Sequence, residues 1–143
     1  HVLVCWGDTY ILNKSFVVYC YENLNKYSRY ILTFPSALVK NPYVGFLRDN
    51  KGKIMKAIFT KRGDRIMNCE KDFSIFFIKP KNIQQELELM KKKLLKSDGT
   101  LFSYKGELNF LDLIYWLYRK KINIKAFEYN LQNYTRLLLR IQH

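Results

Sequence analysis

Residues 2–22 are VLVCWGDTYILNKSFVVYCYE, and the expected fold depends on how this stretch turns. Two runs of β-branched and aromatic residues flank a polar break at Asn13-Lys14-Ser15, which predicts two strands joined by a hairpin. If Asn13 and Lys14 form a two-residue turn, Trp6 lies opposite Tyr21 and diagonal to Tyr19. An aromatic pair at the end of a ribbon can hold a flat ligand ring between its faces.

A second position for the first turn is equally consistent with turn chemistry. Gly7-Asp8 suits a type II′ hairpin, because glycine adopts the required positive φ without strain. This turn would create three short strands and place Thr9 opposite Trp6. In either arrangement the alternative role of Trp6 is that of an ordinary aromatic residue in the core of a sheet.

The composition predicts a folded domain with an anionic partner. The chain has 143 residues, of which 48% are hydrophobic and 16% aromatic, so we expect a single domain over residues 1–143 with a substantial core. The net charge of +13 favours nucleic acid, a nucleotide or an acidic surface as the partner. The alternative is a basic surface that is merely solvated.

Cysteine usage and hydropathy indicate the setting of the chain. Cys5, Cys20 and Cys69 form no CxxC motif, and the two histidines are the terminal residues, so we expect reduced thiols and no zinc site. No run of about 20 apolar residues occurs, so no membrane span is expected. The chain begins at His1 rather than Met and ends inside a helical pattern, which predicts a piece of a larger protein.

Residues 29–79 favour an antiparallel sheet. We expect strands at residues 29–34, 43–48, 53–60, 65–69 and 73–79, with Pro35 and Pro80 ending the first and the last. Asp49-Asn-Lys-Gly52 is a strong hairpin turn, because Gly52 supplies a residue that tolerates positive φ. These strands predict a meander.

Basic residues are concentrated between residues 48 and 65. They are Arg48, Lys51, Lys53, Lys56, Lys61, Arg62 and Arg65. On a ribbon they would form a stripe that binds phosphates. The alternative is that charged strand edges discourage aggregation.

Three helices are expected after the sheet. Residues 82–97 are predicted to begin at Asn82 with Gln85 as its capping-box partner, and to pack an apolar stripe on the sheet. Residues 109–118 suit a buried helix, and residues 127–141 repeat apolar side chains at helical spacing. The predicted fold is therefore α+β: an antiparallel meander, mostly in residues 1–80, packed on one long helix, with two further C-terminal helices.

The residues favour binding over catalysis. The absence of an internal histidine excludes Ser-His-Asp and Cys-His arrangements. No glycine-rich phosphate loop or carboxylate metal motif occurs, so no catalytic residue, metal or cofactor is predicted. The cluster Glu70-Lys71-Asp72 leaves a metal-dependent nuclease as a residual alternative.

The aromatic ribbon, the basic meander, the long helix and a composition rich in Lys, Asn, Ile and Tyr resemble one known family. The chain resembles the cap-binding domain of bunyavirus polymerases (L proteins), most closely in the orthobunyavirus style. The resemblance spans most of the chain and implies binding of the 5′ m7G cap of host mRNA, for cap-snatching transcription by a viral RNA-directed RNA polymerase. It also implies the other polymerase domains as partners, and a location in the host cytoplasm and the virion.

The resemblance assigns roles to individual residues. Trp6 and Tyr21 would hold the 7-methylguanine ring, with Tyr19 and Tyr10 as substitutes for Tyr21. Asp72, or else Glu70, would accept hydrogen bonds from the guanine edge. The triphosphate would be bound by residues chosen from Lys14, Lys26, Arg29, Arg48, Lys53, Arg62 and Arg65.

Methyl selectivity distinguishes this function from its alternatives. The methylated ring carries a positive charge, which gains roughly 0.5–2 kcal/mol from each aromatic face. A non-specific RNA- or DNA-binding domain that uses a basic sheet surface would instead respond to chain length and salt. A structural or protein-interaction domain would bind neither ligand.

Overall fold

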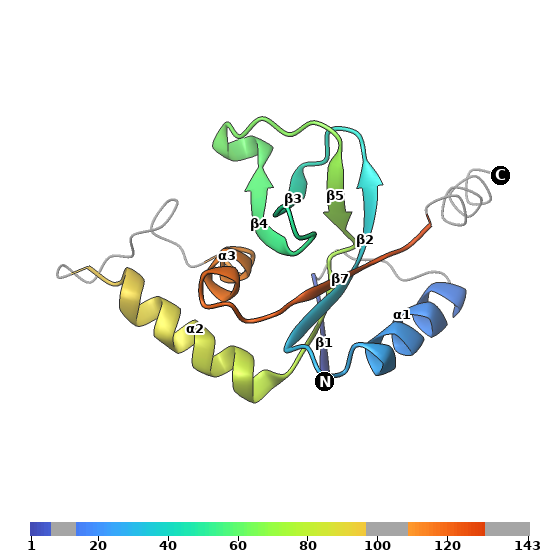
Figure 1. Ribbon diagram of the computed structural model, residues 1–143, viewed down its shortest axis with the longest axis horizontal. Helices are drawn as coiled ribbons and strands as arrows, with labels where there is room; N and C mark the ends of the chain where they lie inside the picture. Colours follow the sequence, from blue (N-terminus) through green and yellow to red (C-terminus); the bar gives the residue numbers. More distant parts are fainter. Residues whose placement is uncertain (7–13, 97–108, 131–143) are drawn as a thin grey trace.

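The computed structural model describes residues 1–6, 14–96 and 109–130. Its fold is α+β, which confirms the predicted class: a seven-stranded sheet and, within the described residues, three α-helices (Figure 1). The elements are β1 (Val2–Cys5), α1 (Lys14–Lys26), β2 (Leu32–Val39), β3 (Val44–Arg48), β4 (Ile54–Phe59), a 3-10 turn η1 (Thr60–Arg62), β5 (Cys69–Asp72), β6 (Ile75–Ile78), α2 (Pro80–Leu94), α3 (Asp112–Arg119) and β7 (Lys125–Glu128).

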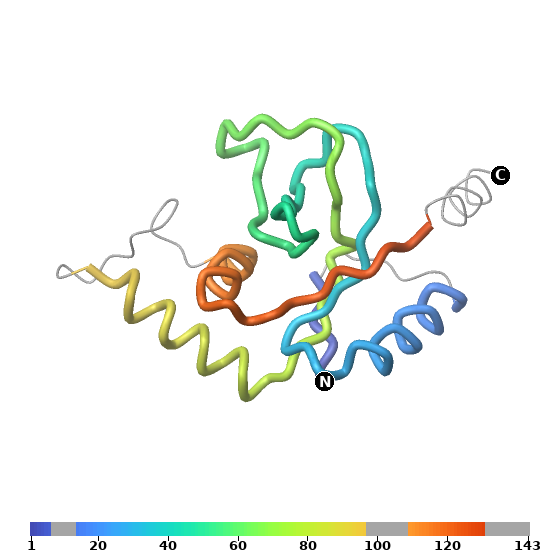
Figure 2. Tube along the Cα trace, in the orientation of Figure 1, coloured from blue at the N-terminus to red at the C-terminus, as the bar shows by residue number. Residues whose placement is uncertain are grey.

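The strand order is β1-β6-β2-β5-β3-β4, so the predicted meander is wrong. β3 and β4 form the expected antiparallel hairpin, but β5 lies between β3 and β2 instead of following β4. β7 adds to β2 as the one parallel pairing within the described strands. Figure 2 shows β2 and β7 running side by side although about ninety residues separate them.

A bulge joins β5 and β6 into one bent strand along β2. Ser36 lies opposite Asp72 and Thr33 opposite Phe77, so three steps on β2 match five on its partner. The two extra residues are Phe73 and Ser74, and Ser74 adopts a left-handed φ of 59°. The bend allows β1 to pair with β6 while β3 pairs with β5.

The bulge also explains why β2 passes through Pro35. The sequence predicts that Pro35 ends this strand, which is wrong, because β2 continues to Val39. Pro35 lies beside the bulge, where the ladder with β5 and β6 is already interrupted. Proline lacks the backbone N–H and is tolerated at such positions.

The predicted N-terminal hairpin is wrong, because residues 14–26 form α1. Phe16, Cys20 and Leu24 recur every four residues and pack against the sheet from one helix face. This tertiary packing overrides the β propensity of Val17 and Val18, which stay exposed. The turn proposed at Gly7-Asp8 lies outside the described residues, and so does Asn13 of the turn proposed at Asn13-Lys14.

The sheet lies between two helical layers (Figure 1). Successive side chains of β6 point to opposite faces of the sheet and enter different cores. Phe76 belongs to the core beneath α2 and α3, whereas Ile75 and Phe77 belong to the core beneath α1. α2 contributes Ile83 and Met90 to the first of these cores. The sheet therefore packs on both faces, and not on one long helix alone.

Several local predictions are confirmed with shifted bounds. Gly52 has the expected positive φ of 74° in the β3–β4 turn. α2 begins at Pro80 after Lys79 rather than at Asn82, because proline is favoured in the first helical turn. α3 matches the helix expected at residues 109–118. The strand expected at residues 65–69 is wrong except at its last residue, because β5 begins at Cys69.

The expected last helix is wrong at its beginning. Its first residues fall in β7, where Ala126 and Phe127 pair with Phe34 and Pro35 of β2. The remainder, from residue 131, lies outside the described residues, as does a short strand expected at residues 100–104.

Candidate functional site

The two aromatic residues predicted to hold a ligand ring lie on opposite faces of the sheet. Trp6 packs with Phe76 and Phe110, each 5.9 Å away between ring centroids, on the α2–α3 side. Tyr21 is 64% exposed on α1 and lines an apolar groove with Phe77 on the other side. The predicted Trp6–Tyr21 sandwich is therefore not formed, because Tyr21 lies on a helix and not on a strand paired with β1.

The two substitute tyrosines do not complete the sandwich. Tyr19 packs against Phe127 and Tyr129, and its hydroxyl donates to the Glu128 carbonyl. Burial is the largest of several causes that raise the pKa of this hydroxyl, which keeps it a donor. Tyr10 lies outside the described residues.

The two carboxylates predicted to accept from guanine are engaged within the sheet. Asp72 is buried and accepts from the backbone N–H of Ser74 at the bulge. Burial raises the pKa of Asp72, although the bond from Ser74 opposes that shift. Glu70 forms an ion pair with Arg48 and accepts from the Ser36 hydroxyl at 2.9 Å. The carbonyl of Ser74 in turn accepts from the backbone N–H of Trp6 at 3.2 Å.

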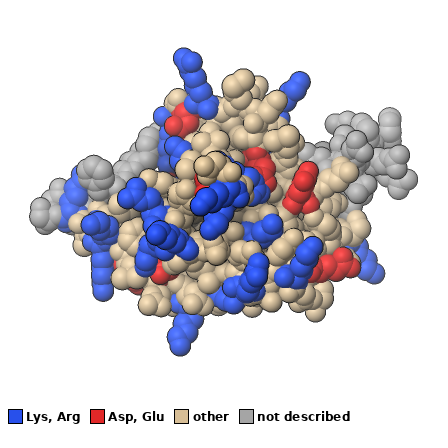
Figure 3. Space-filling model, viewed as in Figure 1, with Lys and Arg blue, Asp and Glu red and all other residues tan. Residues whose placement is uncertain are grey.

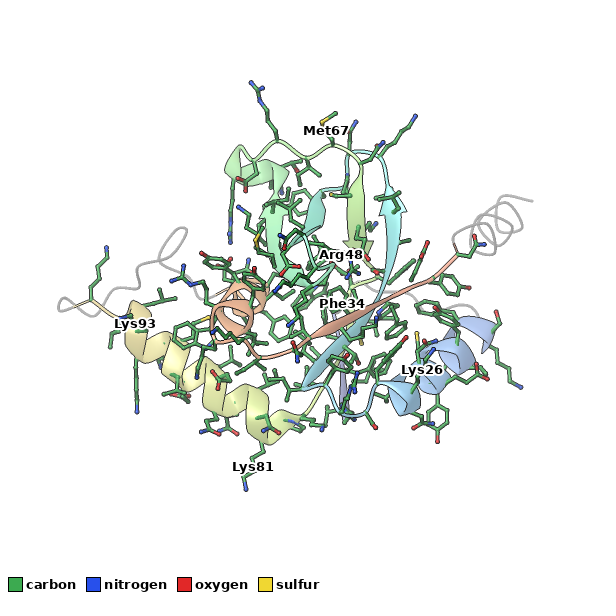
Figure 4. All side chains as sticks on the ribbon, in the orientation of Figure 1. Lys26, Phe34, Arg48, Met67, Lys81 and Lys93 are labelled. Carbon is green, nitrogen blue, oxygen red and sulfur yellow. The ribbon has the colours of Figure 1, made fainter. Side chains whose placement is uncertain are left out.

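The predicted phosphate-binding residues separate into four groups. Arg48 and Arg62 are neutralised by Glu70 and Asp112, respectively. In Figure 4 Arg48 lies near the middle of the view, whereas Lys26 lies at α1. The α1 side holds Lys14, Lys26 and Arg29, the last two of which lie over the rings of Tyr27 and Tyr30. Arg65 is exposed between η1 and β5, and only Lys53 lines a basic cavity.

This cavity, here called the basic pocket, has a volume of about 500 Å³ and lies between two loops. The β3–β4 turn contributes Asp49, Asn50, Lys51, Lys53 and Ile54, and the end of α3 with its connection to β7 contributes Tyr118, Arg119, Lys121, Ile122, Asn123 and Ile124. Lys53 Nζ donates to Asn123 Oδ1 at 3.1 Å and joins the two walls. The volume is in the range of cavities that bind small ligands, about 300–1,000 Å³.

Asp49 builds the turn wall of the basic pocket. Its Oδ1 accepts from the backbone N–H groups of Lys51 and Lys53, both at 2.9 Å. The bond from Lys53 is the main cause of a lowered pKa for Asp49, with further contributions from Lys51, Tyr118 and the charge of Lys53. Asp49 is therefore ionised at neutral pH and fixed in position.

Lys121 builds the opposite wall from an unfavourable backbone conformation. The N–H of Ile122 bonds the Leu117 carbonyl and that of Lys121 bonds the Tyr118 carbonyl, both at 2.9 Å, which is a Schellman motif. Its left-handed position is normally glycine, but here Lys121 has a φ of 60°. Residues other than glycine that are held at a positive φ are strained, and such residues are concentrated at functional sites. Lys121 is one of them, and its charged side chain lines the pocket.

The basic pocket has an excess of unneutralised positive charge. Four basic side chains and one carboxylate line it. Within the described part of the chain, none of the four makes an ion pair with a carboxylate. Figure 3 shows Lys and Arg side chains gathered over the middle of this face, where the β3–β4 hairpin and α3 lie in Figure 1. The basic stripe predicted from the sequence includes Lys51 and Lys53 of the turn wall, but not Arg119 and Lys121 of the opposite wall.

Two further observations concern the described residues alone. None of their helices combines the length and the hydropathy needed to cross a membrane. No three of their His, Cys, Asp and Glu side chains are placed to hold a metal ion together.

The chain was also compared with known proteins. No protein-family model matches it, and no curated protein does.

Proposed function

We propose that this domain binds nucleic acid through the phosphate backbone, with the basic pocket as its principal contact. The observation that carries the proposal is a cavity of about 500 Å³ lined by Lys51, Lys53, Arg119 and Lys121 against the single carboxylate of Asp49. Lysine and arginine side chains that lack a carboxylate partner are the groups that replace counterions on a phosphate chain.

The lining of the pocket suits a flexible strand better than an isolated anion. Ile54, Ile122 and Ile124 add apolar surface beside the basic groups, and Tyr118 adds an aromatic ring. Single-stranded nucleic acid combines phosphates with flat base faces, and proteins bind it with basic grooves and stacking surfaces. The net charge of +13 adds long-range attraction for a polyanion.

The test combines Lys53→Gln with Lys121→Gly and measures binding of a labelled single-stranded RNA by fluorescence anisotropy. We expect the dissociation constant to rise about tenfold, equivalent to about 1.4 kcal/mol. Glycine suits the left-handed backbone at Lys121. Lys121→Gly alone should therefore keep or raise the melting temperature while weakening binding, which separates loss of binding from loss of folding.

The matched control is Lys81→Gln combined with Lys93→Gln. Both lysines are exposed on α2, away from the pocket, and point outward in Figure 4. This control removes the same charge, so we expect less than about a twofold change in affinity. An equal loss of affinity in the two double variants would refute the assignment to the pocket, and so would a wild type that binds no RNA.

Cap binding stays a separate prediction of the family resemblance. It predicts that m7GTP raises the melting temperature of the wild type more than GTP does, and that Trp6→Ala abolishes the difference. Binding through the phosphate backbone predicts equal shifts with both nucleotides. A thermal-shift titration with the two nucleotides in parallel therefore distinguishes the two functions.

A further inference from the structure

The basic groups of the pocket are suited to bind phosphates, but the pocket also contains one carboxylate, which repels phosphates. Asp49 lines the cavity and precedes Lys51 and Lys53 in the same turn, and hydrogen bonds from the backbone N–H groups of these two lysines fix its position. The charge at this position therefore lowers the affinity for a bare phosphate chain. A ligand that donates a hydrogen bond to the carboxylate would recover this loss.

Asp49 retains capacity to accept such a bond. An ionised carboxylate offers about four acceptor positions. Oδ1 accepts two backbone N–H groups, and the side chain of Tyr118 supplies a third hydrogen bond to the carboxylate. These partners leave one acceptor position on a carboxylate whose cavity is also lined by Lys51 and Lys53.

The donor must lie close to a phosphate, because the basic groups adjoin Asp49 on the same short turn. In RNA the 2′-hydroxyl and the 3′-phosphate are carried by neighbouring carbons of the ribose. DNA has the phosphate without this hydroxyl, and the 2′-hydroxyl is the group by which proteins distinguish the two polymers at a given site. The donors on a base edge lie farther from the phosphate.

We infer that Asp49 makes the basic pocket selective for RNA over DNA by accepting a hydrogen bond from a ribose 2′-hydroxyl. This inference rests on the proposed function. Asp49 recognises the sugar, while Lys51, Lys53 and Lys121 bind the adjacent phosphates. The apolar wall of Ile54, Ile122 and Ile124 faces the rest of the nucleotide.

The test measures the affinity of the chain for oligouridine RNA and for oligodeoxyuridine DNA of on the order of twelve nucleotides. The two polymers differ only at the 2′ position. We expect the wild type to bind the RNA about tenfold more tightly, the magnitude of one hydrogen bond to a charged group. Asp49→Asn should reduce this ratio to near one and raise the affinity for DNA, since it removes a repulsive charge. Its amide oxygen can still accept from Lys51 and Lys53, so the turn is retained.

Glu88→Gln is the matched control, because Glu88 is exposed on α2 and loses the same charge. It should leave the ratio of RNA to DNA affinity unchanged. Equal binding of both polymers by the wild type would overturn the inference and leave the proposed function intact. An unchanged ratio in Asp49→Asn would overturn it too, as would a preference for guanine-containing DNA over oligouridine RNA. Failure of the wild type to bind either polymer would overturn the proposed function itself.

Discussion

Gly45 on β3 shows how a single residue fixes the spacing of two strands. A Cβ atom built on Gly45 would lie 2.1 Å from the Sγ atom of Cys69 on β5. It would also lie 3.2 Å from Ile66, which covers this end of the sheet together with Ile58 and Cys69. The absence of a side chain at Gly45 therefore allows Cys69 to fill the space above β3.

Gly45→Ala is expected to lower the free energy of unfolding by about 1–3 kcal/mol, because an added methyl group overpacks this cluster. Chemical denaturation monitored by circular dichroism measures the loss. Cys69→Ala removes the Sγ atom that the new methyl would meet. The double variant should therefore lose less stability than the sum of the two single variants, and strict additivity would contradict the proposed contact.

α2 and α3 are joined by a small polar network on the edge of the larger core. Glu86 on α2 accepts from Trp116 Nε1 at 2.8 Å and forms an ion pair with Lys120, whose Nζ lies 2.8 Å from Oε2. Burial disfavours ionisation of Glu86, but the hydrogen bonds from Lys120 and Trp116 and the charge of Lys120 outweigh it and lower its pKa. The network therefore depends on the charged carboxylate.

The stability contributed by Glu86 should depend on pH. Because its pKa is lowered in the folded state, this contribution is complete above the ordinary pKa of glutamate and is lost as the pH falls through the folded-state value. Glu86→Gln should cost about 1 kcal/mol at neutral pH and much less at an acidic pH below the lowered pKa of Glu86, as measured by denaturant unfolding. If Glu86→Gln lowered the free energy of unfolding equally at both pH values, the negative charge of Glu86 would not contribute to stability.

The whole molecule carries its positive charge over many elements, but only part of that charge is available to a ligand. Arg48 and Arg62 of the expected basic stripe are paired with carboxylates, and so is Lys120 at the end of α3. The pocket gathers basic groups without a carboxylate partner from two segments distant in the sequence, namely Lys51 and Lys53 from one and Arg119 and Lys121 from the other. Long-range attraction comes from the total charge, whereas specific contacts come from the pocket.

Salt dependence distinguishes these two contributions. The logarithm of the association constant for single-stranded RNA should fall linearly with the logarithm of salt concentration, with a slope of about 0.7 per phosphate contact. Lys53→Gln combined with Lys121→Gly should reduce this slope by about 1.4, corresponding to two lost contacts. Lys81→Gln combined with Lys93→Gln should leave it unchanged. Equal slopes for the wild type and the pocket variant would show that neither lysine contacts phosphate.

Local signals in the sequence determined several elements and half of the site. Gly52 specifies the β3–β4 turn because a left-handed residue is needed there, and Pro80 marks the start of α2. The apolar repeat of α3 places Leu113, Ile114 and Leu117 in the core. The turn of residues 49–52 and the lysine that follows it form one wall of the basic pocket, and both are evident from the sequence because they are contiguous.

The tertiary structure alone decided the remaining elements and the second half of the site. Residues 14–26 have strand propensity, but they form α1 because the sheet offers Phe16 and Cys20 an apolar face to cover. β7 exists because β2 has an unpaired edge, which no pattern within residues 125–128 can reveal. The separation of Trp6 from Tyr21 and the approach of Lys121 to Lys53 have the same origin. Each depends on long-range packing, whose energy comes from contacts between distant segments and not from the propensities of neighbouring residues.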